Sequence, residues 1–212
     1  MQTLSDIYSL QVMTNMNVQT LASLNPTRLH LFPASKSEKV RPAAPNEPEY
    51  PRYYQNIEYD GTKLILQSPL VEMSTLDVRP NMIGNAALIP VTGWLRQQLT
   101  LIEQFVHQHV QIPKDLLQAW PHKRLDYYTS LFEGTSMFIT LSKFCQFTRG
   151  ISPDNCQVVD SIYSFGKGMY SFRIEIPNVY IGPHKGGELF ALNLRVIGIY
   201  CQVETDSVGI HV

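Results

Sequence analysis

Prolines crowd into the first quarter of the chain and restrict what that part can form. Six of the 14 prolines lie between Pro26 and Pro51, with the polar run Ser35–Lys39 among them. Because proline fixes φ and has no backbone N–H, this spacing excludes a continuous helix and the interior of a sheet. We predict an extended linker or long loop over 26–51. Residues 1–24 have spaced apolar side chains and few charges, which suits a short helix or an arm; we favour an arm, so that 1–51 forms an N-terminal extension.

Composition bounds the class of protein. The chain has 212 residues and a formal net charge of −1, with 44% hydrophobic, 17% charged and 10% aromatic residues. This apolar content is enough for a folded core and argues against wholesale disorder. The near-neutral charge excludes a strongly basic nucleic-acid coat protein that binds by charge alone, although a local basic groove stays compatible with it.

Cysteine usage and hydropathy indicate the compartment. The three cysteines, Cys145, Cys156 and Cys201, are odd in number and widely spaced, which argues against a disulfide framework or a zinc site. No apolar run approaches the roughly 18–20 residues that span a bilayer. Met1–Leu10 contains no Lys or Arg, so we expect no secretory signal. We expect an intracellular protein without a membrane partner.

From Tyr53 onward the pattern is typical of β-structure. Ile57–Asp60, Gly61 and Lys63–Ser68 predict a hairpin, because Asp-Gly supplies the positive φ values of a tight turn. Further strands are predicted at 136–141, 157–161, 170–176 and 189–203. In one of them Tyr170, Phe172, Ile174 and Ile176 share a face. We predict a mainly β fold, a small barrel or a sandwich, and favour an OB-like five-stranded barrel over 52–204 with a short tail at 205–212.

One helix is predicted inside this β domain. Leu95, Leu99, Ile102 and Val106 recur at helical spacing, Thr92 can cap the start, and Pro113 ends the pattern. A second short helix is predicted over 114–120.

The sequence contains no convincing catalytic or metal-binding pattern. His107 and His109 follow a helix, on which residues two apart point about 200° apart, so a polar helix end is favoured over a metal site. Gly166–Gly168 and Gly182–Gly187 lack the spacing of a phosphate-binding loop and predict hairpin turns. The carboxylates are scattered, and no serine or cysteine has a recognisable catalytic partner. We predict a protein that is not an enzyme and needs no metal or cofactor.

Aromatic and basic residues alternate in Trp120–Tyr128, Lys143–Gly150 and Tyr163–Tyr170. Single-stranded nucleic acid binds to such mixtures, because bases stack on aromatic faces while cations follow the phosphates. Packing of the same aromatics in the core or across strands is the competing interpretation. The candidate stacking residues are Tyr127, Tyr128, Phe144, Phe147, Tyr163 and Tyr170. The candidate phosphate contacts are Lys123, Arg124, Lys143, Arg149, Lys167, Arg173 and Lys185.

Several segments resemble one family. Gly61–Pro69, an apolar strand closing in Gln-Ser-Pro, resembles the early hairpin of the single-stranded DNA-binding proteins of large DNA viruses and tailed phages. Gly168–Ile176, Val179–Ile181 and Phe190–Val196 are similar to their closing strands. The resemblance implies an OB fold interrupted by a helix, and the coating of single-stranded DNA in replication or recombination without catalysis. The family commonly ends in an acidic tail that recruits replication proteins, whereas Glu204–Val212 holds only two acids.

Two functional hypotheses follow. The preferred one is a single-stranded DNA-binding protein that self-associates through its N-terminal arm and can interact with replication proteins. Such a protein would act in the host cytoplasm or nucleus if viral, and in the cytoplasm if it comes from a phage. The alternative is a structural or assembly protein, such as a β-sandwich virion or scaffold component whose arm packs on a neighbouring subunit. DNA or RNA preference stays open.

Overall fold

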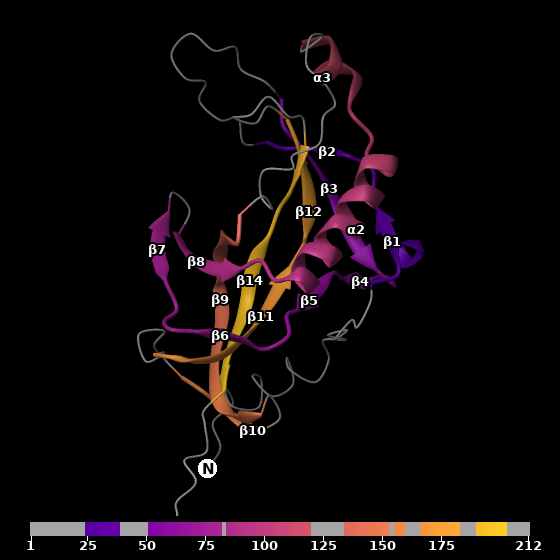
Figure 1. Ribbon diagram of the computed structural model, residues 1–212. Coiled ribbons are helices and arrows are strands. Elements are labelled where there is room, and N and C mark those ends of the chain that lie inside the picture. Colours follow the sequence, from indigo (N-terminus) through magenta and orange to yellow (C-terminus); the bar gives the residue numbers. More distant parts are fainter. Residues whose placement is uncertain are drawn as a thin grey trace, which may run out of the picture.

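The protein is mainly β-structured, as its sequence predicts, and its strands form two sheets (Figure 1). The computed structural model describes residues 24–38, 51–81, 84–119, 134–152, 155–159, 166–182 and 190–202. The smaller sheet has the order β1 (Leu29–Leu31), β3 (Tyr53–Tyr59), β12 (Asn178–Ile181), β13 (Phe190–Leu192), with β2 (Ser35–Lys36) and β4 (Thr62–Lys63) also paired to β3. The larger sheet has the order β5 (Ile65–Gln67), β11 (Gly168–Glu175), β14 (Arg195–Gln202), β9 (Ser136–Ser152), β8 (Gly84–Pro90), β7 (Val78–Asn81), with β6 (Val71–Met73) paired to β11 and β10 (Asn155–Val158) paired to β9.

Two segments pass directly from one sheet into the other and join them. β4 continues into β5 through Leu64, and β11 continues into β12 through Ile176 and Pro177. The Ile176 N–H donates to the Leu64 carbonyl over 2.9 Å, so the two crossings lie side by side. Pro177 has no N–H with which to extend the ladder, which accounts for the end of β11 at this point.

The predicted hairpin is confirmed, and its second arm is divided. Asp60 and Gly61 have φ values of 49° and 69°, the left-handed conformation that a tight hairpin turn needs. Lys63 pairs with Glu58 across the turn. After Leu64 the chain leaves this ladder, and β5 pairs with β11 in the larger sheet. The single strand predicted over 63–68 is therefore two strands, β4 in the smaller sheet and β5 in the larger one.

Both predicted helices are present. The helix α2 (Gly93–His109) begins at Thr92, whose hydroxyl accepts from the Leu95 N–H over 3.2 Å. Its apolar face is buried at the predicted positions Leu95, Leu99, Ile102 and Val106. The helix α3 (Lys114–Ala119) follows after Pro113. In Figure 1, α2 lies alongside the strands of the smaller sheet.

The proline-rich segment is not a linker throughout, and this corrects the predicted boundary at 51. Leu24 and Leu29 are buried, and β1 and β2 pair with β3. Pro26 lies in the first turn of the 3₁₀ helix η1 (Pro26–Arg28), where a missing N–H costs nothing. Pro33 falls between β1 and β2, so both strands keep their donors. Residues 1–23 and 39–50 lie outside the described residues.

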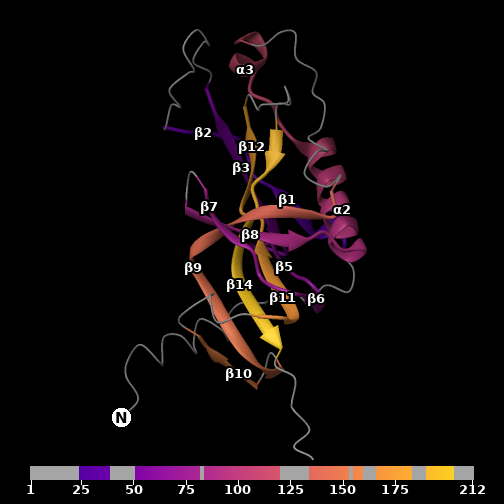
Figure 2. The ribbon, with the colours of Figure 1, turned by 60° about the vertical axis from the view of Figure 1, so that its left-hand side comes forward.

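The larger sheet is open where a closed five-stranded barrel was predicted. In the described part of the chain its path ends at β5 on one side and β7 on the other. β9 and β14 are parallel, and β9 bends along the sheet towards β10 (Figure 2). One apolar core includes both sheets and α2, and it contains Tyr170, Phe172 and Ile174 of β11 and the following Ile176, as predicted. No helix among the described residues is long and apolar enough to cross a membrane.

Candidate functional site

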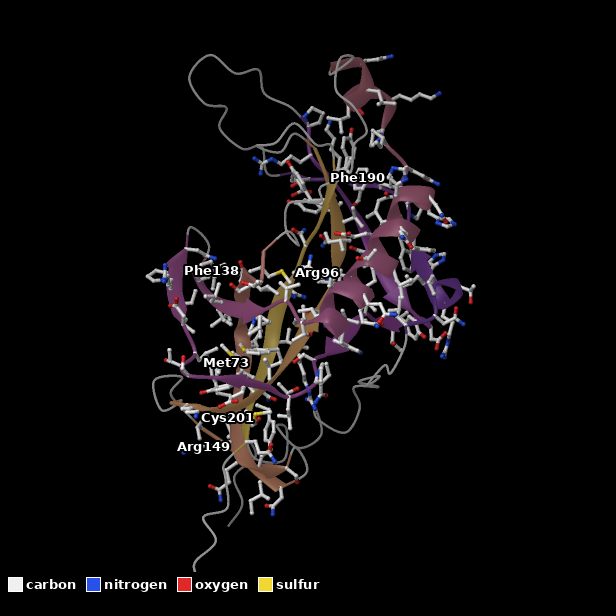
Figure 3. The ribbon with its side chains drawn as sticks, viewed as in Figure 1. Met73, Arg96, Phe138, Arg149, Phe190 and Cys201 are labelled. Atoms are coloured by element: carbon white, nitrogen blue, oxygen red, sulfur yellow. The ribbon has the colours of Figure 1, made fainter. Side chains whose placement is uncertain are left out.

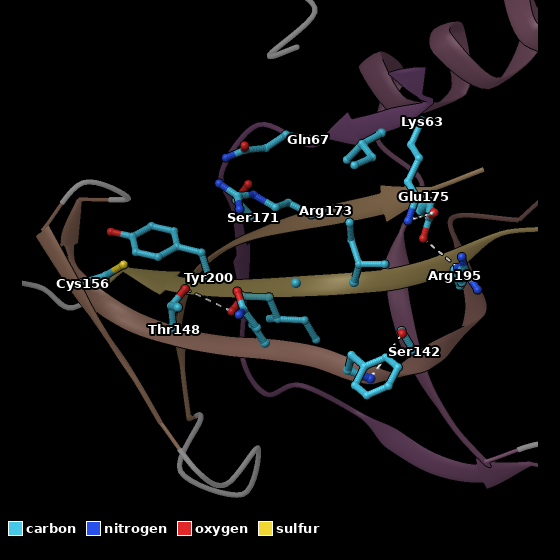
Figure 4. Close-up of a pocket in the computed structure, with 16 residues that line it drawn as sticks. Lys63, Gln67, Ser142, Thr148, Cys156, Ser171, Arg173, Glu175, Arg195 and Tyr200 are labelled. Carbon is cyan, nitrogen blue, oxygen red and sulfur yellow. Dashed lines mark hydrogen bonds and ion pairs between the residues drawn. The ribbon is translucent and has the colours of Figure 1, made fainter. Parts of the chain in front are cut away.

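A pocket of about 560 Å³ lies on the face of the larger sheet opposite the core (Figure 4). Its floor is formed by alternate residues of β11, namely Ser171, Arg173 and Glu175, whereas the residues between them face the core. Successive side chains of a strand point to opposite faces, so one strand supplies both the core and the pocket. β14, β9, β5, β4 and β10 contribute the remaining lining residues.

Two irregularities shape the floor and rim. Arg173 pairs with Gly198 and Ile174 with Val196, so Ile197 is an extra residue that bulges towards the pocket. The Arg173 side chain passes over Gly198, where an added Cβ would be in ordinary contact with it, 3.4 Å from the Arg173 Cδ.

The second irregularity places an aromatic ring at the rim. Leu141 pairs with Val196 and Gln146 with Gly198, so residues 142–145 of β9 have no partner register on β14. This bulge carries Phe144 outwards, where the residue is 76% exposed. The Lys143 ammonium lies 4.7 Å from the centroid of the Phe144 ring. An apolar ring this exposed, beside a cation, is available to a planar ligand.

Three charged side chains meet at one end of the pocket. The Glu175 Oε2 accepts from the Arg195 Nε over 2.7 Å, and its Oε1 lies 3.6 Å from the Lys63 Nζ. Burial acts to raise the pKa of the Glu175 carboxyl, but the hydrogen bond from Arg195 and the charges of Arg195 and Lys63 outweigh it, and the pKa lies below its ordinary value. Glu175 is therefore a carboxylate at neutral pH.

Neutral polar groups line the other end. The Tyr200 hydroxyl donates to the Gly150 carbonyl over 2.9 Å, which anchors the end of β9 to β14. Burial raises the pKa of Tyr200, so the phenol stays protonated over the physiological range. Thr148, Gln146 and Gln67 also face this part of the pocket. With Arg173 at the centre, the floor offers hydrogen-bond donors and acceptors along its length.

Two of the predicted site residues, Phe144 and Arg173, line this pocket, and Lys143 adjoins it. Phe147 packs against the core from the other face of β9. Arg149 lies two residues further along that face and pairs in register with Cys201 (Figure 3). The aromatic and basic run of β9 is thus divided between two faces.

The remaining predicted residues are placed elsewhere. Tyr170 was predicted to stack on bases, but its ring is 0% exposed and belongs to the core, which removes it as a surface candidate. Lys167 pairs with Glu72 over 3.3 Å at the start of β11, away from the pocket lining. Six predicted residues lie outside the described residues: Lys123, Arg124, Tyr127, Tyr128, Tyr163 and Lys185.

The histidine pair lies at the end of α2 and not in the pocket. The His109 ring stacks on Phe105 with centroids 4.3 Å apart, and its Nδ1 lies 2.8 Å from the Phe105 carbonyl oxygen. The His107 ring instead lies near Phe190, with centroids 6.3 Å apart. Across the described residues, no three His, Cys, Asp or Glu side chains gather closely enough to hold a metal ion.

Lys63, Arg195 and Tyr200 are pocket residues that the sequence reasoning missed. Lys63 follows the hairpin turn and Arg195 begins the last long strand, so neither stands beside an aromatic cluster. The alternation in β11 was a usable signal, because the face opposite Phe172 and Ile174 had to be exposed or ligand-binding.

Comparison of the chain with protein-family models, with curated proteins and with solved structures finds no match. The chemistry of the pocket is therefore the basis for a functional assignment. Its lining contains three cationic side chains, Lys63, Arg173 and Arg195, against the single carboxylate Glu175. Such a lining can attract phosphates, and the exposed Phe144 can stack on a planar group.

Proposed function

We propose that this protein binds and coats single-stranded DNA, without catalysis, through the pocket on β11, β14 and β9. The observation that carries the proposal is the exposed Phe144 ring at the rim of a pocket whose floor holds Arg173. Base stacking on an aromatic side chain contributes roughly 1–3 kcal/mol per base and tolerates any sequence. Cations beside the ring can follow the phosphates of the same strand.

Strand form is the expected basis of selectivity. In a duplex the base faces are stacked within the helix, so Phe144 can reach them only in a single strand or at an end. The neutral groups Gln146, Thr148 and Gln67 can hydrogen-bond sugars or base edges without selecting one base. The protein is therefore expected to bind single strands with little sequence preference.

The proposal requires a curved sheet face and does not require a closed barrel. We propose that the larger sheet acts as the binding face of an OB-fold protein does, with aromatic and basic side chains on strands and their bulges. A role in replication or recombination, and contacts between copies along the strand, follow from coating as proposals of the same kind.

Fluorescence anisotropy tests the proposal. The probes are a labelled oligo-dT of about 30 nucleotides, an abasic strand of the same length, and a duplex, at low and physiological salt. We expect tight binding of oligo-dT, weaker binding of the other two, and a log–log salt slope of about −0.7 to −1.4 from one or two phosphate contacts.

The other outcomes are equally informative. Equal binding of oligo-dT and the abasic strand would refute stacking by Phe144 and leave only loose electrostatic attraction. Absence of binding to every probe would refute the proposed function. The alternative, an assembly protein, would then be examined by sedimentation of the full chain against a variant lacking residues 1–23.

A further inference from the structure

Glu175 forms ion pairs with two of the three cationic side chains of the pocket lining, Lys63 and Arg195. Its side chain is only 5% exposed, whereas those of Lys63 and Arg195 are 68% and 43% exposed. The carboxylate comes from β11, the ammonium from β4 and the guanidinium from β14. Three strands therefore bring one buried anion beneath two cations whose charged groups still reach solvent.

This arrangement sets up a competition. A phosphodiester would use the same donors on Arg195 and Lys63 that Glu175 already engages, and it would also meet the negative charge of Glu175. A phosphate at this end of the pocket therefore gains less than the two cations alone would provide. Stacking on Phe144 and contact with Arg173 do not depend on this competition, because the ion pairs of Glu175 are with Arg195 and Lys63.

We propose that Glu175 is a specificity-determining residue, which engages Lys63 and Arg195 so that a phosphate backbone without an accessible base binds weakly. The inference rests on the proposed function and concerns the same pocket. Specificity is a difference between two affinities, so a residue that weakens binding of the unwanted ligand raises the specificity. Here the unwanted ligands are duplexes and other polyanions, for which the Phe144 stack is not available.

The test is Glu175→Gln, which keeps the side chain's size and removes its charge. Lys63 and Arg195 both reach solvent, so the variant leaves neither cation buried without a partner. As one or two further phosphate contacts would give, we expect the affinity at 0.1 M salt to rise about 5-fold to 25-fold for the abasic strand and about 8-fold to 60-fold for the duplex. The affinity for oligo-dT should rise less, so discrimination falls.

Glu72→Gln is the matched control. Glu72 is an exposed acid paired with Lys167, on β6 beside the same strand β11, and it does not line the pocket. It changes the net charge of the protein by the same amount. We expect less than a 2-fold change for every probe, and an equal gain in both variants would reduce the effect to overall charge and overturn the inference.

The outcomes separate this inference from the proposed function. If the wild-type protein binds none of the probes, the proposed function itself fails. If it binds oligo-dT and Glu175→Gln leaves discrimination unchanged or weakens binding, Glu175 only positions the cations, and the inference alone fails. Glu175→Met, of similar length, is the second variant, with circular dichroism to check folding. Loss of fold in both would assign Glu175 a structural role and overturn the proposal.

Discussion

Replacing Phe144 with alanine removes the ring on which the proposed function depends. The residue is 76% exposed, so the change deletes little buried surface, and the free energy of unfolding should move by less than about 0.5 kcal/mol. The lost stack is worth about 1–3 kcal/mol, which corresponds to roughly 5-fold to 140-fold weaker binding of oligo-dT. Affinity for the abasic strand should stay nearly constant, because that probe has no base to stack.

Anisotropy titration of both probes, together with urea denaturation, measures the two free energies separately. Phe138→Ala is the matched control, since Phe138 is also exposed (47%), lies on the same strand and has Arg79 near its ring, but does not line the pocket. Phe144→Tyr keeps an aromatic face and should restore binding. Equal losses in Phe144→Ala and Phe138→Ala, or an equal loss for the abasic strand, would refute the stacking argument.

Three further predictions concern the charge of the pocket, the core and the docking of α3. Arg173→Gln should weaken oligo-dT binding and make the salt slope shallower by about 0.7, and an unchanged slope would show that Arg173 contacts no phosphate. Leu66 is 0% exposed, so Leu66→Ala should lower the free energy of unfolding, measured by urea denaturation, by about 2–5 kcal/mol. A decrease below about 1 kcal/mol would contradict its place in the core. The Tyr53 hydroxyl donates to Asp115, and this hydrogen bond, together with burial and the charge of Asp115, raises the pKa of Tyr53 to about 12. Tyr53→Phe should therefore lower stability by about 1 kcal/mol below pH 10, with the difference lost as pH rises through 12, and a difference that does not change with pH would contradict this role.

The candidate site was only partly predictable, and its residues show why. Phe144 and Phe147 lie in one aromatic and basic run, yet one reaches the pocket rim and the other packs against the core. Alternation separates the two faces of a strand, but it does not say which face is covered. The bulge at 142–145 depends on pairing with β14, more than fifty residues away in the chain, so no local sequence pattern predicts it.

The features that the sequence alone determined are local ones. The Asp60–Gly61 turn, the capped helix from Gly93 and the buried face of β11 follow from backbone conformation and side-chain spacing within a few residues. These preferences depend only on neighbouring residues, so a local sequence pattern is enough to predict them.

Only the tertiary structure decided which strands and side chains from distant parts of the chain lie together. Residues 29–36 join the smaller sheet because β3 offers them an edge. Lys63, Glu175 and Arg195 meet because Glu175 pairs with Arg195 on one side and, on the other, with Ile65, two residues after Lys63. Such contacts depend on the closure of long loops and on the burial of a shared core, which are properties of the whole chain. The sequence determined the hairpin turn, the start of α2 and the two alternating faces of β11, and the fold decided which residues form a pocket.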